Sequence, residues 1–300
     1  MARSTWIFSA VFISACSGGA HVQERNLGPQ PLSSSTELKK VPETTPEEYV
    51  ARGDKAFERG DYEKSIAEYV NALAGGNADL TILVKIATAH QRVGSNKVAE
   101  STFRQVLAER PDDVDALEGL GLALVQERRY PEARINLDRA LTIDANRWRA
   151  LNALGIISDL DLALETARTY YQRGLEIAPQ SAELLNNLGY SYYLGGDLPE
   201  AEQYFLRALD NDPNHGKAWS NLGLLQVRQQ RQREALVSFL KIMDKPHALN
   251  TVGYVCMLNR NLECAEQYFS QAVAASPQWY KEAADNLDKA RSMRATLSPP

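Results

Sequence analysis

A small residue recurs every 34 residues along most of this chain. Five of its six members are glycine: Gly53, Ala87, Gly121, Gly155, Gly189 and Gly223. Another small residue follows each member after twelve positions and a large apolar one after sixteen, as Ala201 and Phe205 follow Gly189. This constant phase is typical of stacked helix-turn-helix units, because one unit cannot bury its own apolar face.

Glycine at a fixed phase of a helix needs a physical reason. Inside a helix it costs roughly 0.5 to 1 kcal/mol relative to alanine. Its recurrence from Gly53 to Gly223 therefore indicates that two helix backbones approach each other there too closely for a larger side chain.

The clearest unit, residues 182–215, resembles the tetratricopeptide repeat (TPR). It has Gly189 and Tyr192 on its first helix, Gly196 at the turn and Pro213 at the exit, where proline stops the second helix. The resemblance implies an all-α fold, a right-handed TPR superhelix (an α-solenoid) of about seven helix-turn-helix repeats with a C-terminal capping helix. The expected array covers 46–279, with units at 46–79, 80–113, 114–147, 148–181, 182–215, 216–245 and 246–279.

The sixth unit departs from the period, since Gly223 and Gly253 are 30 residues apart. Its second helix is expected to end early, at residues 243–246, with Asp244 capping the next helix and Pro246 in the first turn of that helix. Residues 280–300 are predicted to hold the capping helix and tail. The amphipathic segment that forms this helix runs over 278–293, and its apolar residues are Trp279, Ala283, Leu287 and Ala290.

The N-terminus has the pattern of a bacterial export signal. Arg3 precedes an apolar run from Trp6 to Ala15, which is short for a membrane-spanning helix. The run ends in Ile-Ser-Ala-Cys, which resembles a lipobox, so residues 1–15 are predicted to be a lipoprotein signal peptide and Cys16 the lipidated residue. Ser17 favours the outer membrane by the same resemblance. The alternatives are an ordinary cleaved signal peptide and a buried N-terminal helix of a cytosolic protein.

The segment that follows is expected to be a flexible tether, which we place at residues 16–45. From residue 17 on it contains no aromatic residue and is rich in Ser, Gly, Pro, Gln and Thr. Such a composition buries too little apolar surface to offset the entropy of ordering. A lipid and a tether together are expected to hold the domain at the bacterial envelope, anchored to the membrane and facing the periplasm.

The composition and motifs argue against chemistry on a small substrate. The formal net charge is −5, whereas a nucleic-acid partner calls for a basic stripe. The four histidines lie in separate regions, and no phosphate loop, nucleophile elbow or zinc motif is present. We therefore expect no enzyme activity, cofactor, metal site, small-molecule substrate or nucleic-acid partner.

Two cysteines fall on the two helices of the seventh unit. Cys256 and Cys264 straddle the predicted turn, so their Cα atoms can lie within the roughly 7 Å that a disulfide allows. Our first interpretation is two free, small core residues. A disulfide is the alternative, and export would permit it.

In the TPR family the first helix of each unit lines the inner groove. The resemblance places these residues there in units five to seven: Asn186, Asn187, Tyr190, Tyr193, Asn221, Leu224, Arg228, Asn250 and Tyr254. Asn187 and Asn221 occupy the phase at which peptide-binding members grip a ligand backbone with an amide that both donates and accepts. The tyrosines would add apolar area with a polar tip, unless they only pack between repeats.

The lipobox, tether, TPR array, shortened sixth unit and Ala-rich cap together resemble the TadD family of tight-adherence (Tad/Flp) pilus assembly. The resemblance implies a non-catalytic protein–protein interaction scaffold that assists the assembly or localisation of the secretin channel. One alternative is a type IV pilus pilotin or another envelope TPR lipoprotein adaptor. The other, a cytosolic TPR co-chaperone adaptor, requires an uncleaved N-terminus.

Overall fold

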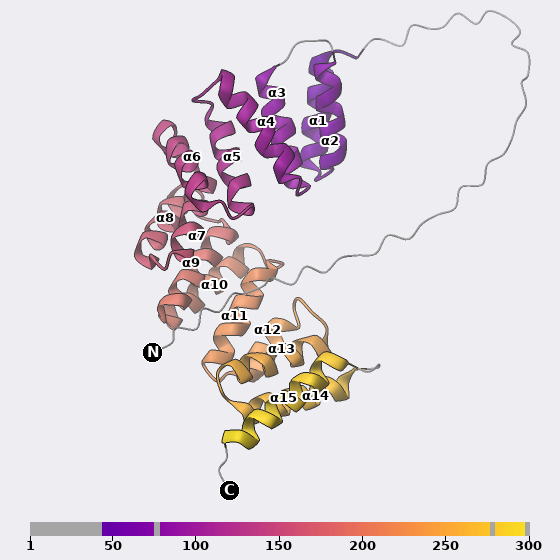
Figure 1. Cartoon of the computed structure of the whole chain (residues 1–300), viewed down its shortest axis with the longest axis vertical. Helices are drawn as coiled ribbons and strands as arrows, with labels where there is room; N and C mark the ends of the chain where they lie inside the picture. Colours follow the sequence, from indigo (N-terminus) through magenta and orange to yellow (C-terminus); the bar gives the residue numbers. More distant parts are fainter. Residues whose placement is uncertain (1–43, 75–78, 277–279, 298–300) are drawn as a thin grey trace, which may run out of the picture. The chain divides into compact units, whose positions relative to one another are not determined.

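The computed structural model describes residues 44–74, 79–276 and 280–297, which form fifteen α-helices and no strand (Figure 1). The predicted signal peptide, Cys16, the tether up to residue 43 and Trp279 lie outside these described residues. The helices are α1 Pro46–Glu58, α2 Tyr62–Leu73, α3 Leu80–Arg92, α4 Asn96–Glu109, α5 Val114–Gln126, α6 Tyr130–Ile143, α7 Trp148–Leu160, α8 Leu164–Ile177, α9 Ala182–Gly195, α10 Leu198–Asn211, α11 Gly216–Arg228, α12 Gln232–Phe239, α13 Lys245–Leu258, α14 Leu262–Ala275 and α15 Lys281–Leu297. Among them, none combines the length and the apolar character needed to cross a membrane.

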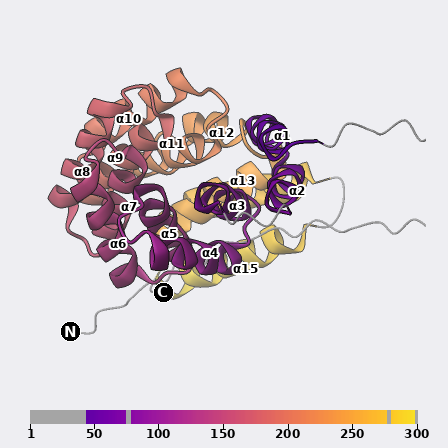
Figure 2. The same ribbon diagram turned by 90° about the horizontal axis from the view of Figure 1, so that it is seen from above.

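Helices pack in chain order, so each is covered by its sequence neighbours. Every odd-numbered helix from α1 to α13 packs against the even-numbered helix that follows it, and that helix packs against the next odd one. From α3 on, each odd helix also packs against the next odd helix, whereas the even helices in the described chain have no comparable contacts with one another. The odd helices therefore form one face, here called the inner face, and α6, α8 and α10 lie outside it (Figure 2). The predicted all-α TPR stack is confirmed.

The recurring glycines lie under large side chains of the following helix. A Cβ atom on Gly155 would lie 2.4 Å from Cε1 of Tyr171, and one on Gly223 would lie 2.7 Å from Cζ of Phe239. Side chains are close-packed in protein interiors, so neither site has room for even a methyl group without rearrangement. The prediction that a second helix backbone crowds these positions is corrected, because the crowding group is an aromatic ring of the following helix.

Each helix pair turns at a residue whose backbone is left-handed. These residues are Gly60, Gly94, Arg128, Leu162, Gly196, Gln230 and Arg260, with φ between 59° and 89°. The first six keep the 34-residue period, yet only three of the seven are glycine. At Leu162 the turn is held because its N–H donates to the Asp159 carbonyl at 3.0 Å and the N–H of Ala163 donates to Ser158 at 2.9 Å. The packed helix pair thus imposes on Leu162 a left-handed backbone that a residue with a Cβ atom disfavours.

Replacing Leu162 by glycine is expected to stabilise the protein by about 0.5 to 1 kcal/mol. Left-handed backbone costs a non-glycine residue about 1 to 2 kcal/mol, and the extra freedom of glycine in the unfolded chain offsets part of that gain. The Leu162 side chain is 75% exposed, so little packing is lost. Urea unfolding measures the change. The reciprocal control is Gly60→Ala, which has open space for a Cβ and the same sign of φ, and should lose stability. Equal or lower stability of Leu162→Gly would contradict the argument.

The sixth unit is short because its second helix is short. α12 ends at Phe239, four residues before the predicted region of termination, and spans only eight residues. Asp244 caps α13 by accepting from the His247 N–H at 3.0 Å, and Pro246 lies in the first turn, which confirms the predicted cap. α13 itself begins at Lys245, one residue before the predicted unit boundary.

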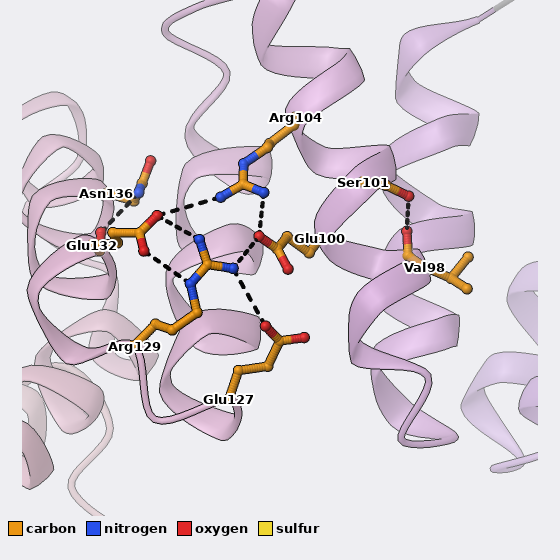
Figure 3. Close-up of polar contacts among 8 residues, drawn as sticks. All are labelled: Val98, Glu100, Ser101, Arg104, Glu127, Arg129, Glu132 and Asn136. Atoms are coloured by element: carbon orange, nitrogen blue, oxygen red, sulfur yellow. Dashed lines mark hydrogen bonds and ion pairs between the residues drawn. The ribbon is translucent and has the colours of Figure 1, made fainter.

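Ion pairs join neighbouring even helices on the outer side of the stack. Arg129, at the start of α6, donates to Glu100 of α4 at 2.6 Å and also to Glu132 at 2.6 Å, while Arg104 of α4 contacts both carboxylates (Figure 3). The hydrogen bonds from Arg129 lower the pKa of Glu132. The same arrangement recurs three 34-residue periods later. There Arg231 donates to Glu202 at 2.7 Å and also to Glu234. These ion pairs link neighbouring units on the outer side of the stack.

The C-terminal helix α15 closes the last pair. Ala283, Leu287 and Ala290 are buried in the same apolar cluster as Phe269 of α14. The helix continues to Leu297, four residues beyond the segment expected from the sequence. It therefore covers the apolar surface that the last repeat would expose.

Candidate functional site

The residues predicted for the partner groove lie on three consecutive odd helices. Asn186, Asn187, Tyr190 and Tyr193 are on α9, Asn221, Leu224 and Arg228 on α11, and Asn250 and Tyr254 on α13. Their exposure differs widely, since Asn186 and Asn250 are buried and only Arg228 and Tyr254 are well exposed. The set is brought onto one face, but most of it is not free to meet a ligand.

The asparagines of α7, α9 and α11 form a ladder of side-chain amides between neighbouring units. Asn187 Nδ2 donates to Asn152 Oδ1 at 2.9 Å, and Asn187 Oδ1 accepts from Asn186 at 3.1 Å. Asn186 Oδ1 in turn accepts from Asn221 Nδ2 at 2.9 Å. The two asparagines expected to grip a ligand backbone therefore hydrogen-bond within the ladder, and a buried amide left without such partners would cost about 1 to 3 kcal/mol.

A second amide link joins the last repeat to the capping helix. Asn250 Oδ1 accepts from Asn286 Nδ2 at 3.1 Å, and Asn250 Nδ2 donates to Glu282 Oε1 at 3.4 Å. Asn250 is 6% exposed. Its role in the structure is to connect α13 to α15.

Tyrosines and an arginine make the contact between α9 and α11. The rings of Tyr190 and Tyr193 stack with centroids 6.1 Å apart, and the Arg228 guanidinium lies 5.1 Å from the Tyr193 ring. Arg228 Nη1 also donates to the Tyr193 carbonyl at 3.1 Å. Burial raises the pKa of the Tyr190 hydroxyl above its ordinary range. Tyr190 and Tyr193 therefore pack between neighbouring helices, as the alternative interpretation of the sequence proposed, whereas Tyr254 is exposed to solvent.

A series of apolar side chains on the odd helices remains exposed. Leu160 on α7, Leu194 on α9 and Leu258 on α13 occupy one phase of the repeat and are 56%, 38% and 48% exposed. Tyr254, one turn before Leu258, is 45% exposed. Exposed apolar side chains in a constant phase are a surface that an apolar partner segment can cover.

Two hollows on the inner face lie in the other half of the array. One, of about 300 Å³, is lined by residues of α1, α2, α3, α5 and the start of α7, and includes Lys85 and Glu118. The next, of about 370 Å³, is lined by residues of α3, α4, α5, α7 and α9, and includes Asn96 and Gln126. One hollow in the predicted units, lined by His215 and its neighbours, is smaller, at about 250 Å³. The sequence prediction missed this region, although Arg92 and Arg149 fall on its odd helices.

One buried carboxyl group outside these hollows has a strongly altered environment. Asp159 accepts hydrogen bonds from the Tyr171 hydroxyl at 2.8 Å and from the Ser191 hydroxyl at 2.7 Å. Burial raises the pKa of Asp159 despite both bonds. Since its oxygens already hold α8 and α9 to α7, we assign it a structural role.

Cys256 and Cys264 are joined by a disulfide. Their Cα atoms lie 5.8 Å apart across the α13–α14 turn, within the range that a disulfide allows. Our first interpretation, two free core thiols, is therefore corrected. The short turn between α13 and α14 brings the two sulfur atoms together. The repeat phase places both cysteines near this turn but does not determine whether they bond. No group of three or more potential metal-binding side chains occurs among the described residues.

Comparison with known proteins identifies the repeats and the fold. A tetratricopeptide repeat family model matches residues 84–147, 157–215 and 196–245, just over half of the chain. No protein of curated function matches the sequence.

Several solved structures share the fold. A tetratricopeptide repeat protein from Parabacteroides merdae ATCC 43184 is 15% identical with a TM-score of 0.56, over 82% of this chain and 98% of that chain. The APC/C hetero-tetramer Cut9–Hcn1 contains a chain 17% identical with a TM-score of 0.62, over 84% of this chain and 50% of that chain. Pseudomonas aeruginosa pilF is 16% identical with a TM-score of 0.55, over 71% of this chain and 97% of that chain. At these identities the likeness shows the fold alone.

Proposed function

Because the chain belongs to the tetratricopeptide repeat family, we propose that it is a non-catalytic scaffold that holds a protein partner at the bacterial envelope. The family fold generally serves protein–protein interaction rather than catalysis. The observation that carries the proposal is the exposed apolar series on the odd helices, Leu160, Leu194, Tyr254 and Leu258. Such side chains bury apolar area when a partner segment covers them, at about 25 cal/mol per Å².

The envelope location rests on two features. The lipobox-like sequence before Cys16 supports a lipid anchor, and the outer membrane facing the periplasm is the location we propose. The Cys256–Cys264 disulfide supports an oxidising compartment, because such bonds persist outside the reducing cytosol.

The partner we propose is a segment of the secretin of a Tad/Flp pilus machine. This follows from the combination of lipobox, tether, TPR array and Ala-rich cap, which resembles the TadD family. A type IV pilus pilotin is the second candidate. The fold likeness to Pseudomonas aeruginosa pilF is compatible with it, at 16% identity.

The proposed partner surface on α9–α13, here called the groove, is tested by truncating two of its exposed apolar side chains in cells that make the protein. We expect the double variant Tyr254→Ala, Leu194→Ala to bind its partner about tenfold more weakly, because truncating two exposed apolar contacts removes roughly 1 to 2 kcal/mol of binding. Assembled secretin multimers and surface Tad/Flp pili should decrease accordingly. Immunoblotting of multimers that resist heat and electron microscopy of pili measure the two effects.

Matched variants separate the groove from folding and anchoring. Leu206→Ala, Val237→Ala removes apolar side chains that are at least as exposed, from even helices, and should leave secretin assembly unchanged. Palmitate should label both double variants but not Cys16→Ser. Normal Tad/Flp pili in the Tyr254→Ala, Leu194→Ala variant would refute the role of the groove. Loss of type IV pili instead would favour the pilotin function. Palmitate labelling of Cys16→Ser would refute the lipid anchor at Cys16.

A further inference from the structure

Polar contacts cross nearly every joint of the array, where a joint is the contact between one helix pair and the next. On the inner face each of these contacts connects two consecutive odd helices. From α1 to α11 the connected residues are Lys85 and Asp54, Gln91 and Gly119, Ala150 and Glu118, Asn187 and Asn152, and Asn221 and Asn186. Asn286 and Asn250 connect α15 to α13 in the same way.

Ion pairs cross most of the same joints on the outer side. Each joins a residue of one even helix to the turn that precedes the next even helix. The pairs are Glu100 and Arg129, Arg134 and Asp161, Arg168 and Asp197, and Glu202 and Arg231. Directional contacts of this kind help to fix the angle at which neighbouring units pack.

The joint between the sixth and seventh units lacks both kinds of contact. Among the residues that the structure describes, no hydrogen bond or ion pair connects α11 or α12 with α13 or α14. Leu236 occupies the phase of Glu202, and Ser220 the phase of Asn186, each 34 residues later. An apolar side chain cannot form the ion pair, and the serine hydroxyl has a shorter reach than the amide. One partner of each contact is therefore missing at this joint.

Apolar packing holds this joint together instead. Phe239 of α12 and Val227 of α11 lie in one cluster with Leu249 and Val252 of α13. Burial of apolar surface is not directional, whereas a hydrogen bond weakens steeply when its angle changes. The joint therefore resists separation of the two units more than it resists rotation of one against the other.

The chain crosses this joint at Met243 and Asp244. The Met243 N–H donates to the Phe239 carbonyl at 3.0 Å, which ties Met243 to the end of α12. Asp244 instead caps α13 by accepting from the His247 N–H at 3.0 Å. The Thr251 hydroxyl also contacts the Met243 sulfur at 3.5 Å, but a thioether is a weak acceptor. This short connection is therefore the place where the backbone can turn.

A hollow beside the joint gives the two units room to move. Its volume is about 240 Å³, and it is lined by Arg228 and Gln230 of the sixth unit and by Asn259 and Asn261 of the seventh. No hydrogen bond joins these two sets of side chains in the described part of the chain. The units can therefore approach each other here without first breaking a polar contact.

The helices beyond the joint are fastened to one another. The Cys256–Cys264 disulfide connects α13 to α14. Asn250 of α13 accepts from Asn286 of α15 at 3.1 Å, and all three helices share one apolar cluster. Helices α13–α15 thus have the contacts of a single rigid body.

We propose that the joint between α12 and α13 is a hinge, about which α13–α15 rotates as one body against α1–α12. Leu194 belongs to the first body, and Tyr254 and Leu258 belong to the second, so rotation changes the distance between these exposed side chains. The hinge is a property of the chain alone, whereas its use in adjusting that surface to a partner rests on the proposed function.

The test measures distances within the purified full chain, without a partner. Nitroxides are attached through a ketone-bearing amino acid, so that the native cysteines stay unmodified. The test pair is Gln203 on α10 and Gln267 on α14, which spans the hinge. The control pair, Ser101 on α4 and Thr169 on α8, is also two units apart and at the same phase of the repeat, and all four residues are exposed. Double electron–electron resonance gives the distance distributions.

We expect the test pair to give a distribution about twofold broader than that of the control pair, because rotation about a hinge adds to the spread of the labels themselves. Ser220→Asn, Thr251→Asn places two amides where Asn186 and Asn221 bond in the preceding joint. This double variant should narrow the test distribution to the width of the control. Slow hydrogen exchange in α13 and α14 of the same protein would show that the second body moves without unfolding.

Three results would overturn the hinge. Equal widths for the two pairs would mean that this joint is no more mobile than the others. Rapid hydrogen exchange throughout α13 and α14 would mean that the spread comes from local unfolding. An unchanged width in the folded Ser220→Asn, Thr251→Asn variant would mean that the missing amide pair does not free the joint.

Discussion

Gly189→Leu is expected to destabilise the array by about 3 kcal/mol or more, at the upper end of the cost of overpacking a close contact. A Cβ at Gly189 would lie 2.9 Å from Phe205 Cδ1 and 3.1 Å from the carbonyl oxygen of Ala201. Leucine adds three further carbons to the same space. The ring cannot withdraw easily, because Phe205 is fully buried. The fifth unit would have to open, and its neighbours would lose the surface on which they pack.

Two comparisons make this result specific. Gly216→Leu inserts the same side chain where the nearest atom is Ile242 Cγ2 at 3.7 Å, so stability should be unchanged or slightly higher. Phe205→Ala should partly rescue Gly189→Leu by returning volume to the contact. Circular dichroism during thermal and urea unfolding measures all three. Unaltered stability of Gly189→Leu would mean that the ring of Phe205 moves freely.

Loss of the disulfide is expected to destabilise the C-terminal end by about 2 to 3 kcal/mol, the magnitude for closing a short loop in the unfolded chain. Cys256 and Cys264 are eight residues apart in sequence and connect α13 to α14. Both lie in the apolar cluster that also holds α15. Because contacts in a repeat array are local, faster hydrogen exchange should be confined to α13, α14 and α15.

Reduction of the wild type distinguishes the bond from the substitutions. Cys256→Ala, Cys264→Ala and the reduced wild type should show the same faster exchange in α13–α15, while α5–α9 stay protected in both. If the reduced wild type exchanged as slowly as the oxidised protein, packing alone would stabilise the last repeat and the bond would contribute little.

The architecture could be predicted from the sequence because each of its main contacts recurs. Gly189 over Phe205 is repeated as Gly155 over Tyr171 and Gly223 over Phe239, so the period reports a contact that recurs in the units with glycine at this phase. The cap at Asp244 was also predictable, since capping depends on a few consecutive residues. A single sequence therefore predicts contacts that repeat in several units and contacts between residues that are close along the chain.

The asparagine prediction illustrates the opposite case. Asn187 and Asn221 occur at the phase of a ligand-gripping amide, yet each hydrogen-bonds to an asparagine of a neighbouring helix. An amide donates and accepts equally well to a ligand or to another amide. Its partner depends on how far apart α7, α9 and α11 pack, and residue type carries no record of that distance.

The sequence by itself determined the repeat, the helix pairs and the small residues that let them pack. Only the tertiary structure decided the Cys256–Cys264 bond and the amide ladder that joins Asn187 to Asn152 and Asn186 to Asn221. Each of these depends on the distance between groups that occur once in the chain. The hydrophobic pattern is periodic because burial repeats from unit to unit, whereas a single polar contact is set by the packing of several helices at one place.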